Sequence, residues 1–148
     1  MQQAYRYSIL YFLAFSLLLL ASSILLFNEK IGFSYGSILE YYLGNEESFM
    51  MAKTPSGLLK IILPHIFGFG LFIMVVLHFV MFTKTNKKRI MPYLISATFI
   101  SGFIELFSPF FILYGFEFFA YLKLLSLFVF ESLLLYMFWI LYSSIINK

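Results

Sequence analysis

The chain has 148 residues, of which 62% are apolar, 22% are aromatic and only 11% are charged, and its formal net charge is +3. A soluble domain of this length could not bury so much apolar surface, so the composition excludes a water-soluble globular protein. The absence of cysteine excludes disulfides, thiolate metal sites, thiol catalysis and lipid attachment through cysteine. The sequence therefore predicts a membrane protein.

Four apolar runs follow one another along the chain. Crossing about 30 Å of hydrocarbon takes about 20 apolar residues in a helix, and the runs at about residues 8–27, 58–82, 92–114 and 119–146 are all long enough. They predict an all-α bundle of four transmembrane helices, forming a single integral membrane domain over residues 1–148. The first run is longer than a usual signal-peptide core and stays apolar from Ile24 onward, so we expect it to be retained as a helix.

The connection between the first two runs is the only sizeable segment predicted outside the bilayer. Within it, the segment from Ser37 to Leu43 predicts a short amphipathic helix that ends at Gly44. We expect this helix to anchor the bundle in the headgroup layer, where tyrosines are common, more than to act as a ligand lid. Thr54 and Pro55 are typical of a helix start and predict where the second span begins.

Basic residues cluster in the short connection between the second and third runs. Lys84, Lys87, Lys88 and Arg89 lie there without any acidic residue, which predicts a cytoplasmic loop. With four spans, both termini are then expected on the cytoplasmic side of a bacterial inner membrane. We interpret these residues as orientation determinants that contact anionic lipid headgroups, and not as a nucleic-acid site.

Only four ionisable side chains are predicted well inside the spans: His65, His78, Glu105 and Glu131. Counting about 1.5 Å per residue from each helix midpoint places His65, Glu105 and Glu131 about 9, 3 and 4 Å toward the outer side. His78 falls about 10 Å toward the cytoplasm. Because a charge inside the bilayer costs at least about 2.5 kcal/mol, these positions are candidate functional residues.

The third run carries a polar stripe at helical spacing. Thr98, Ser101, Glu105 and Ser108 fall along one side of the predicted helix, and lipid cannot solvate them, so this side is expected to face the bundle. Pro109 lacks an N–H group and therefore leaves the carbonyl of Glu105 without its helical donor. Such a break is compatible with a polar cavity or with simple packing.

We predict that His65, Glu105 and Glu131 converge in one polar pocket that opens toward the outer face. Lys60 and Lys123 are expected at its rim, with their ammonium groups extended toward water. Imidazole and carboxylates together can relay protons or bind a divalent metal or another cation. Two acids in such a site would not both stay charged without a cation, so at least one glutamate is expected to be protonated at neutral pH.

The two histidines lie thirteen residues apart on one predicted membrane helix, and this spacing resembles that of b-type cytochromes, in which two haems are stacked across the bilayer. The resemblance implies haem b ligated through His65, His78 or both. At about 100° per residue the two side chains point about 140° apart, and the chain has no third histidine to complete bis-histidine ligation. A homodimer, or a methionine such as Met74, Met81 or Met137, would have to supply the other ligand.

Signatures of soluble enzymes are missing from the sequence: it has no phosphate-binding loop, HExxH, GxSxG or dinucleotide fingerprint. We therefore assign no enzyme class and no catalytic residue. One hypothesis is a small redox-, ion- or proton-handling membrane subunit with an intramembrane His/Glu site. The alternatives are a non-catalytic accessory or assembly subunit, in contact with other membrane subunits or a second copy, and a b-type haem protein.

Overall fold

The computed structural model describes residues 3–47, 49–83 and 89–146. In this part of the chain there are five helices, α1 (Gln3–Lys30), α2 (Tyr35–Leu43), α3 (Pro55–Met81), α4 (Met91–Leu113) and α5 (Phe119–Ile146). The four longer helices are long and apolar enough to cross a membrane. The predicted fold class is confirmed, although α1 extends further at both ends than the sequence suggested.

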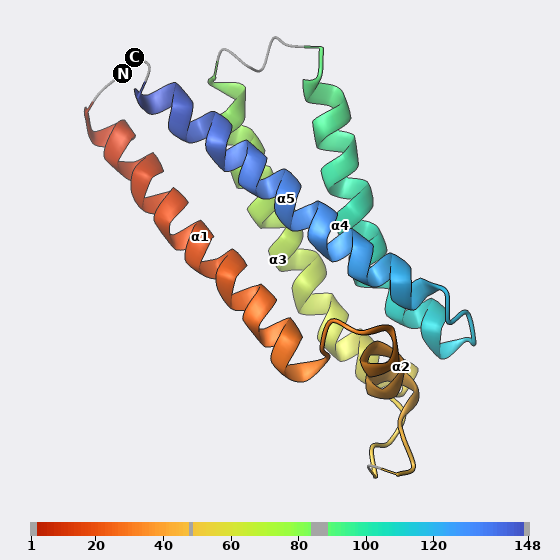
Figure 1. Cartoon of the computed structure of the whole chain (residues 1–148). Helices are drawn as coiled ribbons and strands as arrows, with labels where there is room; N and C mark the ends of the chain where they lie inside the picture. Colours follow the sequence, from red (N-terminus) through yellow and green to blue (C-terminus); the bar gives the residue numbers. More distant parts are fainter. Residues whose placement is uncertain (1–2, 48, 84–88, 147–148) are drawn as a thin grey trace.

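Helix α5 is the centre of the bundle. Helix α4 packs along it as its antiparallel neighbour, α3 lies against both, and α1 packs mainly on α5 (Figure 1). The start of α1, the end of α3, the start of α4 and the end of α5 share one end of the bundle. Helix α2 and the short α4–α5 turn lie at the opposite end, which we call the α2 end.

Helix α2 forms where the sequence predicts it and packs more deeply than expected. The Ser34 side chain accepts a hydrogen bond from the Ser37 N–H at 3.0 Å, and Gly44 ends the helix with φ of 84°, a conformation that favours glycine. Ile38 and Tyr42, four residues apart, are buried against the bundle. They belong to an apolar cluster at the α2 end, composed of Phe27, Ile38, Tyr42, Leu58, Ile62, Ile112, Ala120 and Leu127.

Helix α3 begins as predicted. Thr54 precedes the helix, and its hydroxyl oxygen accepts a hydrogen bond from the Gly57 N–H at 3.1 Å, while Pro55 is the first helical residue. Leu58 and Ile62 near this start belong to the same apolar cluster as Ile38 and Tyr42, while α2 itself packs mainly on α4 and α5, so α2 and the bundle form one packed unit.

A close contact fixes the middle of the α4–α5 pair. A Cβ atom added at Gly102 would lie 3.0 Å from the ring of Phe130, and the same ring stacks on Phe69 of α3 with centroids 5.0 Å apart. The missing side chain of Gly102 thus makes room for an aromatic residue that connects three helices.

Candidate functional site: a buried ion pair at the α2 end

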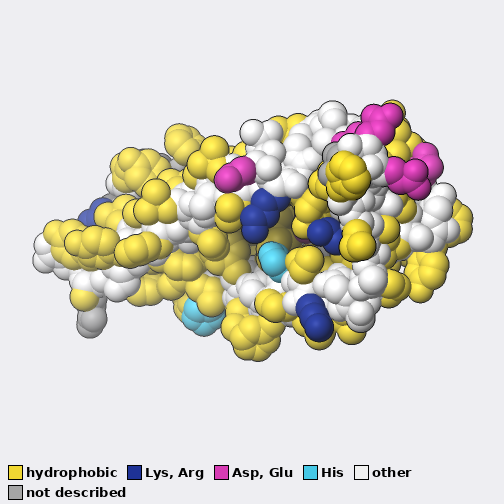
Figure 2. Space-filling view, turned by 90° about the horizontal axis from the view of Figure 1, so that it is seen from below, with side chains coloured by type: hydrophobic (Ala, Val, Ile, Leu, Met, Phe, Trp, Pro, Cys, Tyr) yellow, Lys and Arg dark blue, Asp and Glu magenta, His cyan; other side chains and the backbone are white. Residues whose placement is uncertain are grey.

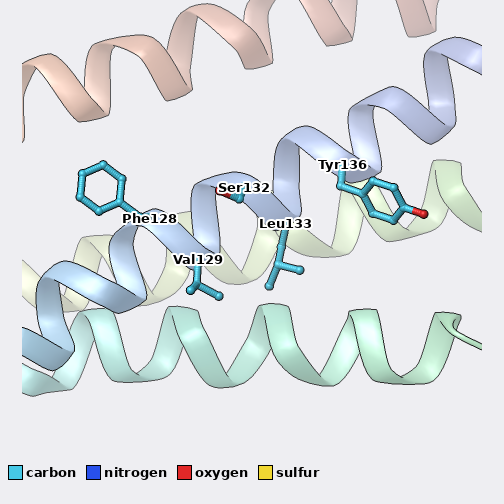
Figure 3. A pocket seen from close by; sticks show the side chains of 5 residues that line it. All are labelled: Phe128, Val129, Ser132, Leu133 and Tyr136. Carbon is cyan, nitrogen blue, oxygen red and sulfur yellow. The ribbon is translucent and has the colours of Figure 1, made fainter.

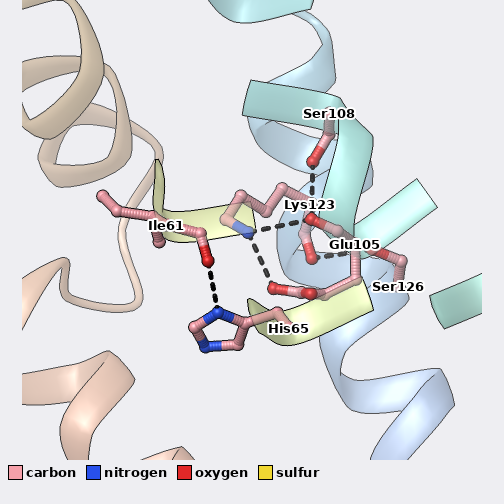
Figure 4. Close-up of polar contacts among 6 residues, drawn as sticks. All are labelled: Ile61, His65, Glu105, Ser108, Lys123 and Ser126. Atoms are coloured by element: carbon pink, nitrogen blue, oxygen red, sulfur yellow. Dashed lines mark hydrogen bonds and ion pairs between the residues drawn. The ribbon is translucent and has the colours of Figure 1, made fainter. Parts of the chain in front are cut away.

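Lys123 of α5 and Glu105 of α4 form an ion pair inside the bundle (Figure 4). The ammonium nitrogen lies 2.7 Å from Glu105 Oε1, and the two residues are only 4% and 9% exposed. A charge removed from water requires an opposite charge and further hydrogen bonds. Both requirements are met by the partners described next.

The carbonyl oxygen of Glu105 completes the coordination of Lys123. Pro109 removes the N–H that would otherwise donate to this oxygen within α4. Lys123 Nζ donates to it at 3.0 Å and the Ser108 hydroxyl at 3.3 Å, so both acceptor positions of the freed carbonyl are occupied. Because Pro109 frees the Glu105 carbonyl, as predicted, this oxygen serves as a second hydrogen-bond acceptor for the ammonium group.

Two aromatic rings lie next to this ion pair. Lys123 Nζ is 5.6 Å from the ring centroid of Phe27 in α1 and 6.0 Å from that of Tyr42 in α2. Burial raises the pKa of Tyr42 well above its usual value, and the negative charge of Glu105 raises it further. Helix α2 therefore brings a neutral phenol close to the buried charges.

Glu131 of α5 has a different partner from Glu105. Its Oε1 lies 2.6 Å from the hydroxyl oxygen of Ser23 in α1, and Ser23 also lies 2.9 Å from the carbonyl oxygen of Leu20. Glu131 is 5% exposed, and its Oε2 has no hydrogen-bond partner among the described residues. This carboxyl group therefore belongs to the contact between α1 and α5.

His65 does not join either glutamate by a hydrogen bond. Figure 4 draws no interaction between His65 and the ion pair. The Nδ1 atom of His65 lies 2.7 Å from the carbonyl oxygen of Ile61 in its own helix. The three residues of the predicted pocket thus have three different partners. Within residues 3–47, 49–83 and 89–146, no group of three or more His, Cys, Asp or Glu side chains could hold a metal ion.

The two lysines predicted at the rim behave differently. Lys60 is exposed, as expected. The prediction that Lys123 reaches toward water is wrong, because its ammonium group has a carboxylate and a carbonyl within reach inside the bundle. Figure 2, which views the α2 end, shows Lys and Arg side chains and a histidine around a hollow, with acidic side chains mostly toward the edge.

His78 is exposed on α3, and its ring meets Phe79 and Phe82 with centroid distances of 6.1 and 5.1 Å. No hydrogen bond to His78 occurs in the described part of the chain. Of the predicted orientation residues, Arg89 is exposed just before α4. The other three, Lys84, Lys87 and Lys88, lie outside the described residues.

A shallow groove on α5 is separate from these charges. Figure 3 shows its lining, which is apolar except for two hydroxyl groups and consists of Phe128, Val129, Ser132, Leu133 and Tyr136. It contains no ionisable acid or base suited to proton or cation binding, and we assign it no chemistry.

Sequence reasoning missed three contributors to the site. They are Tyr42, which falls in the predicted interfacial helix, and Phe27 and Ser23, which fall in the first predicted span. The spacing of Ile38 and Tyr42, four apart on a short helix, is a signal for one buried face. No comparable pattern marks Phe27 or Ser23.

Comparison with known proteins agrees with the helical architecture. No curated protein and no solved structure matches the chain. A family model described as a transmembrane helical domain matches residues 32–148, which include α2 to α5 and both members of the ion pair. Together with the four apolar helices, this match shows a small multi-pass membrane protein. The chain belongs to the Aq_1264_TM family of transmembrane helical domains.

Proposed function

We propose that this protein is an ion- or proton-handling membrane subunit in which Glu105, Lys123 and Glu131 are the working ionisable groups. The observation that carries the proposal is the buried Lys123–Glu105 ion pair. Replacing a buried ion pair by well-packed apolar residues is often neutral or stabilising, so such a pair is weak evidence for a purely structural role. Ionisable residues inside a membrane protein commonly mark ion or proton pathways.

The pair is suited to exchange between two states. Protonation of Glu105 would cancel its charge and leave the buried ammonium group of Lys123 without a compensating negative charge. A cation would compete with the ammonium group for the same carboxylate and carbonyl oxygens, which are the ligands that hard cations prefer. Each event changes the charge balance at the contact between α4 and α5.

Proteoliposomes provide the test. Purified protein is reconstituted with a pH-sensitive dye inside the vesicles, and proton flux is recorded under imposed proton, Na⁺ and K⁺ gradients. We expect flux in the wild type and its loss in Glu105→Gln, a near-isosteric change that removes the charge. Glu47→Gln is the matched control, because Glu47 is exposed. Wild-type flux in Glu105→Gln, or no flux in any gradient, would overturn the proposal.

An accessory or assembly role is the second candidate, and the surface of α3 favours it. Cβ atoms added at Gly68 or Gly70 would meet nothing within 4 Å, so this surface is open to close approach by another helix. Cross-linking in native membranes from cysteines introduced at these glycines would capture a neighbouring subunit or a second copy. This role requires no ion or proton flux in the wild type.

Haem or metal ligation through histidine is favoured by the geometry of His65. Because the Ile61 carbonyl can only accept, Nδ1 carries the hydrogen and Nε2 keeps its lone pair, the arrangement common in metal-ligating histidines. An absorption spectrum and metal analysis of the purified protein test this directly. A Soret band lost in His65→Ala or His78→Ala would support haem, whereas a colourless, metal-free protein would exclude it for the purified state.

A further inference from the structure

The contact between Ser23 and Glu131 contains more acceptors than the hydroxyl hydrogen can serve. Ser23 Oγ lies 2.9 Å from the Leu20 carbonyl oxygen and 2.6 Å from Glu131 Oε1. A hydroxyl group has one hydrogen, and neither a carbonyl nor an ionised carboxylate can donate. If Glu131 is protonated, its O–H donates to Ser23 and the Ser23 hydroxyl donates to Leu20, so each short contact has its own hydrogen.

The second oxygen of Glu131 points to the same protonation state. Oε2 is buried without a hydrogen-bond partner in the described part of the chain. An ionised carboxylate with an unpaired oxygen away from water is strongly disfavoured, whereas a neutral acid leaves only a weaker carbonyl-type acceptor unsatisfied. Burial and hydrogen counting are independent observations, and both favour the neutral acid.

Within residues 3–47, 49–83 and 89–146, no cation forms an ion pair with Glu131. On its own helix α5, the ammonium group of Lys123 is bonded to Glu105, the acid of α4. The ionisable residues of α3, Lys60, His65 and His78, are all exposed.

The charged residues of α1 lie in its end turns, away from Ser23. Arg6 donates to the carbonyl of Ile145 at 2.6 Å at the other end of the bundle, and Glu29 and Lys30 are exposed. Among the described residues, the contact between Ser23 and Glu131 therefore holds one acid and no base.

We propose that Glu131 is a proton-binding site inside the bundle, with its proton held toward Ser23. The inference rests on the proposed function in naming the proton as the ion that is handled. Whether Glu131 carries a proton can be measured even if the protein transports no ions. Release of the proton would leave a carboxylate that takes the Ser23 hydrogen away from Leu20, so proton exchange would rearrange the polar contact between α1 and α5.

Labelling with dicyclohexylcarbodiimide tests the occupancy, because this apolar reagent enters the bilayer and reacts with protonated carboxyl groups. Full-length protein in liposomes is treated at neutral pH and mapped by mass spectrometry. We expect a modification at Glu131 that decreases as the pH is raised, and none at the exposed Glu47. Absence of modification at Glu131, or labelling that does not depend on pH, would count against the site.

Infrared spectroscopy supplies a second readout that does not depend on reagent access. The wild type should show the C=O stretching band of a protonated carboxylic acid, shifted in D₂O and lost in Glu131→Gln. An identical spectrum in Glu131→Gln would overturn the inference. A labelled Glu131 in a protein without flux would refute the proposed function alone, whereas flux through a protein with no protonated acid would refute only this inference.

Discussion

Lys123 Nζ lies 2.7 Å from the carboxylate and 3.0 Å from the main-chain carbonyl of the same residue, Glu105. One ammonium group thus satisfies a buried charge and a carbonyl that Pro109 has freed. The two contacts join α4 to α5 close to the turn that connects them. Removal of the charge on either side chain is therefore expected to disturb the packing of α4 against α5.

Replacing Lys123 by methionine should destabilise the protein strongly. The change leaves the Glu105 carboxylate buried without a cation, which costs about 3–5 kcal/mol in unfolding free energy. The double variant Lys123→Met/Glu105→Met should recover much of this loss, because it removes both charges. Thermal and denaturant unfolding in detergent micelles measures the stability of the single and the double variant. Lys60→Met, at an exposed position of the same end, is the control and should change stability little.

Alanine at Gly102 should weaken the α4–α5 contact, whereas alanine at Gly68 should not. The added methyl group at Gly102 meets the Phe130 ring at 3.0 Å, and such overpacking typically costs about 1–3 kcal/mol. Gly68 has open space, so alanine there gains up to about 1 kcal/mol of helix propensity. Equal unfolding midpoints for the two variants would contradict the packing described for Phe130.

Tyr42 should be the last tyrosine to ionise on alkaline titration. Burial and then the charge of Glu105 raise its pKa well above the usual value of about 10. The folded state therefore holds the phenol proton more tightly than the unfolded state, and this contribution to stability is complete below about pH 10 and lost as the pH rises through the folded pKa. When the alkaline titration is followed by ultraviolet phenolate absorbance, Tyr42→Phe should lack the component that appears at the highest pH. Tyr93→Phe, at an exposed position, should keep that component.

Reporter fusions should place the two ends of the bundle on opposite sides of the membrane. The basic α3–α4 connection is expected in the cytoplasm, since short cytoplasmic loops carry an excess of lysine and arginine. Fusions after residues 45 and 116 should report outside, and those after 86 and 148 should report inside. Agreement between 45 and 116 is an internal check, because α2 and the α4–α5 turn share one end (Figure 1). An outside signal at 86 would reverse the orientation.

Much of the fold follows from the sequence alone. Length and apolar composition determined the four spanning helices, because only a helix of about 20 residues can cross hydrocarbon with its backbone hydrogen bonds satisfied. Local rules located the start of α3 at Thr54 and Pro55 and the end of α2 at Gly44. Helical periodicity correctly turned the polar stripe of α4 inward, and its members Thr98, Ser101, Glu105 and Ser108 are all buried.

The partners of the charged groups were decided only by the tertiary structure. Periodicity gives the face of a helix, but the rotation and height of its neighbours determine which side chains meet. The long stem of Lys123 could reach either water or the interior, and the freed carbonyl and carboxylate of Glu105 decided for the interior. In the same way, Glu131 meets Ser23 of α1 while His65 is bonded within its own helix, although depth along the membrane had placed all three near one level.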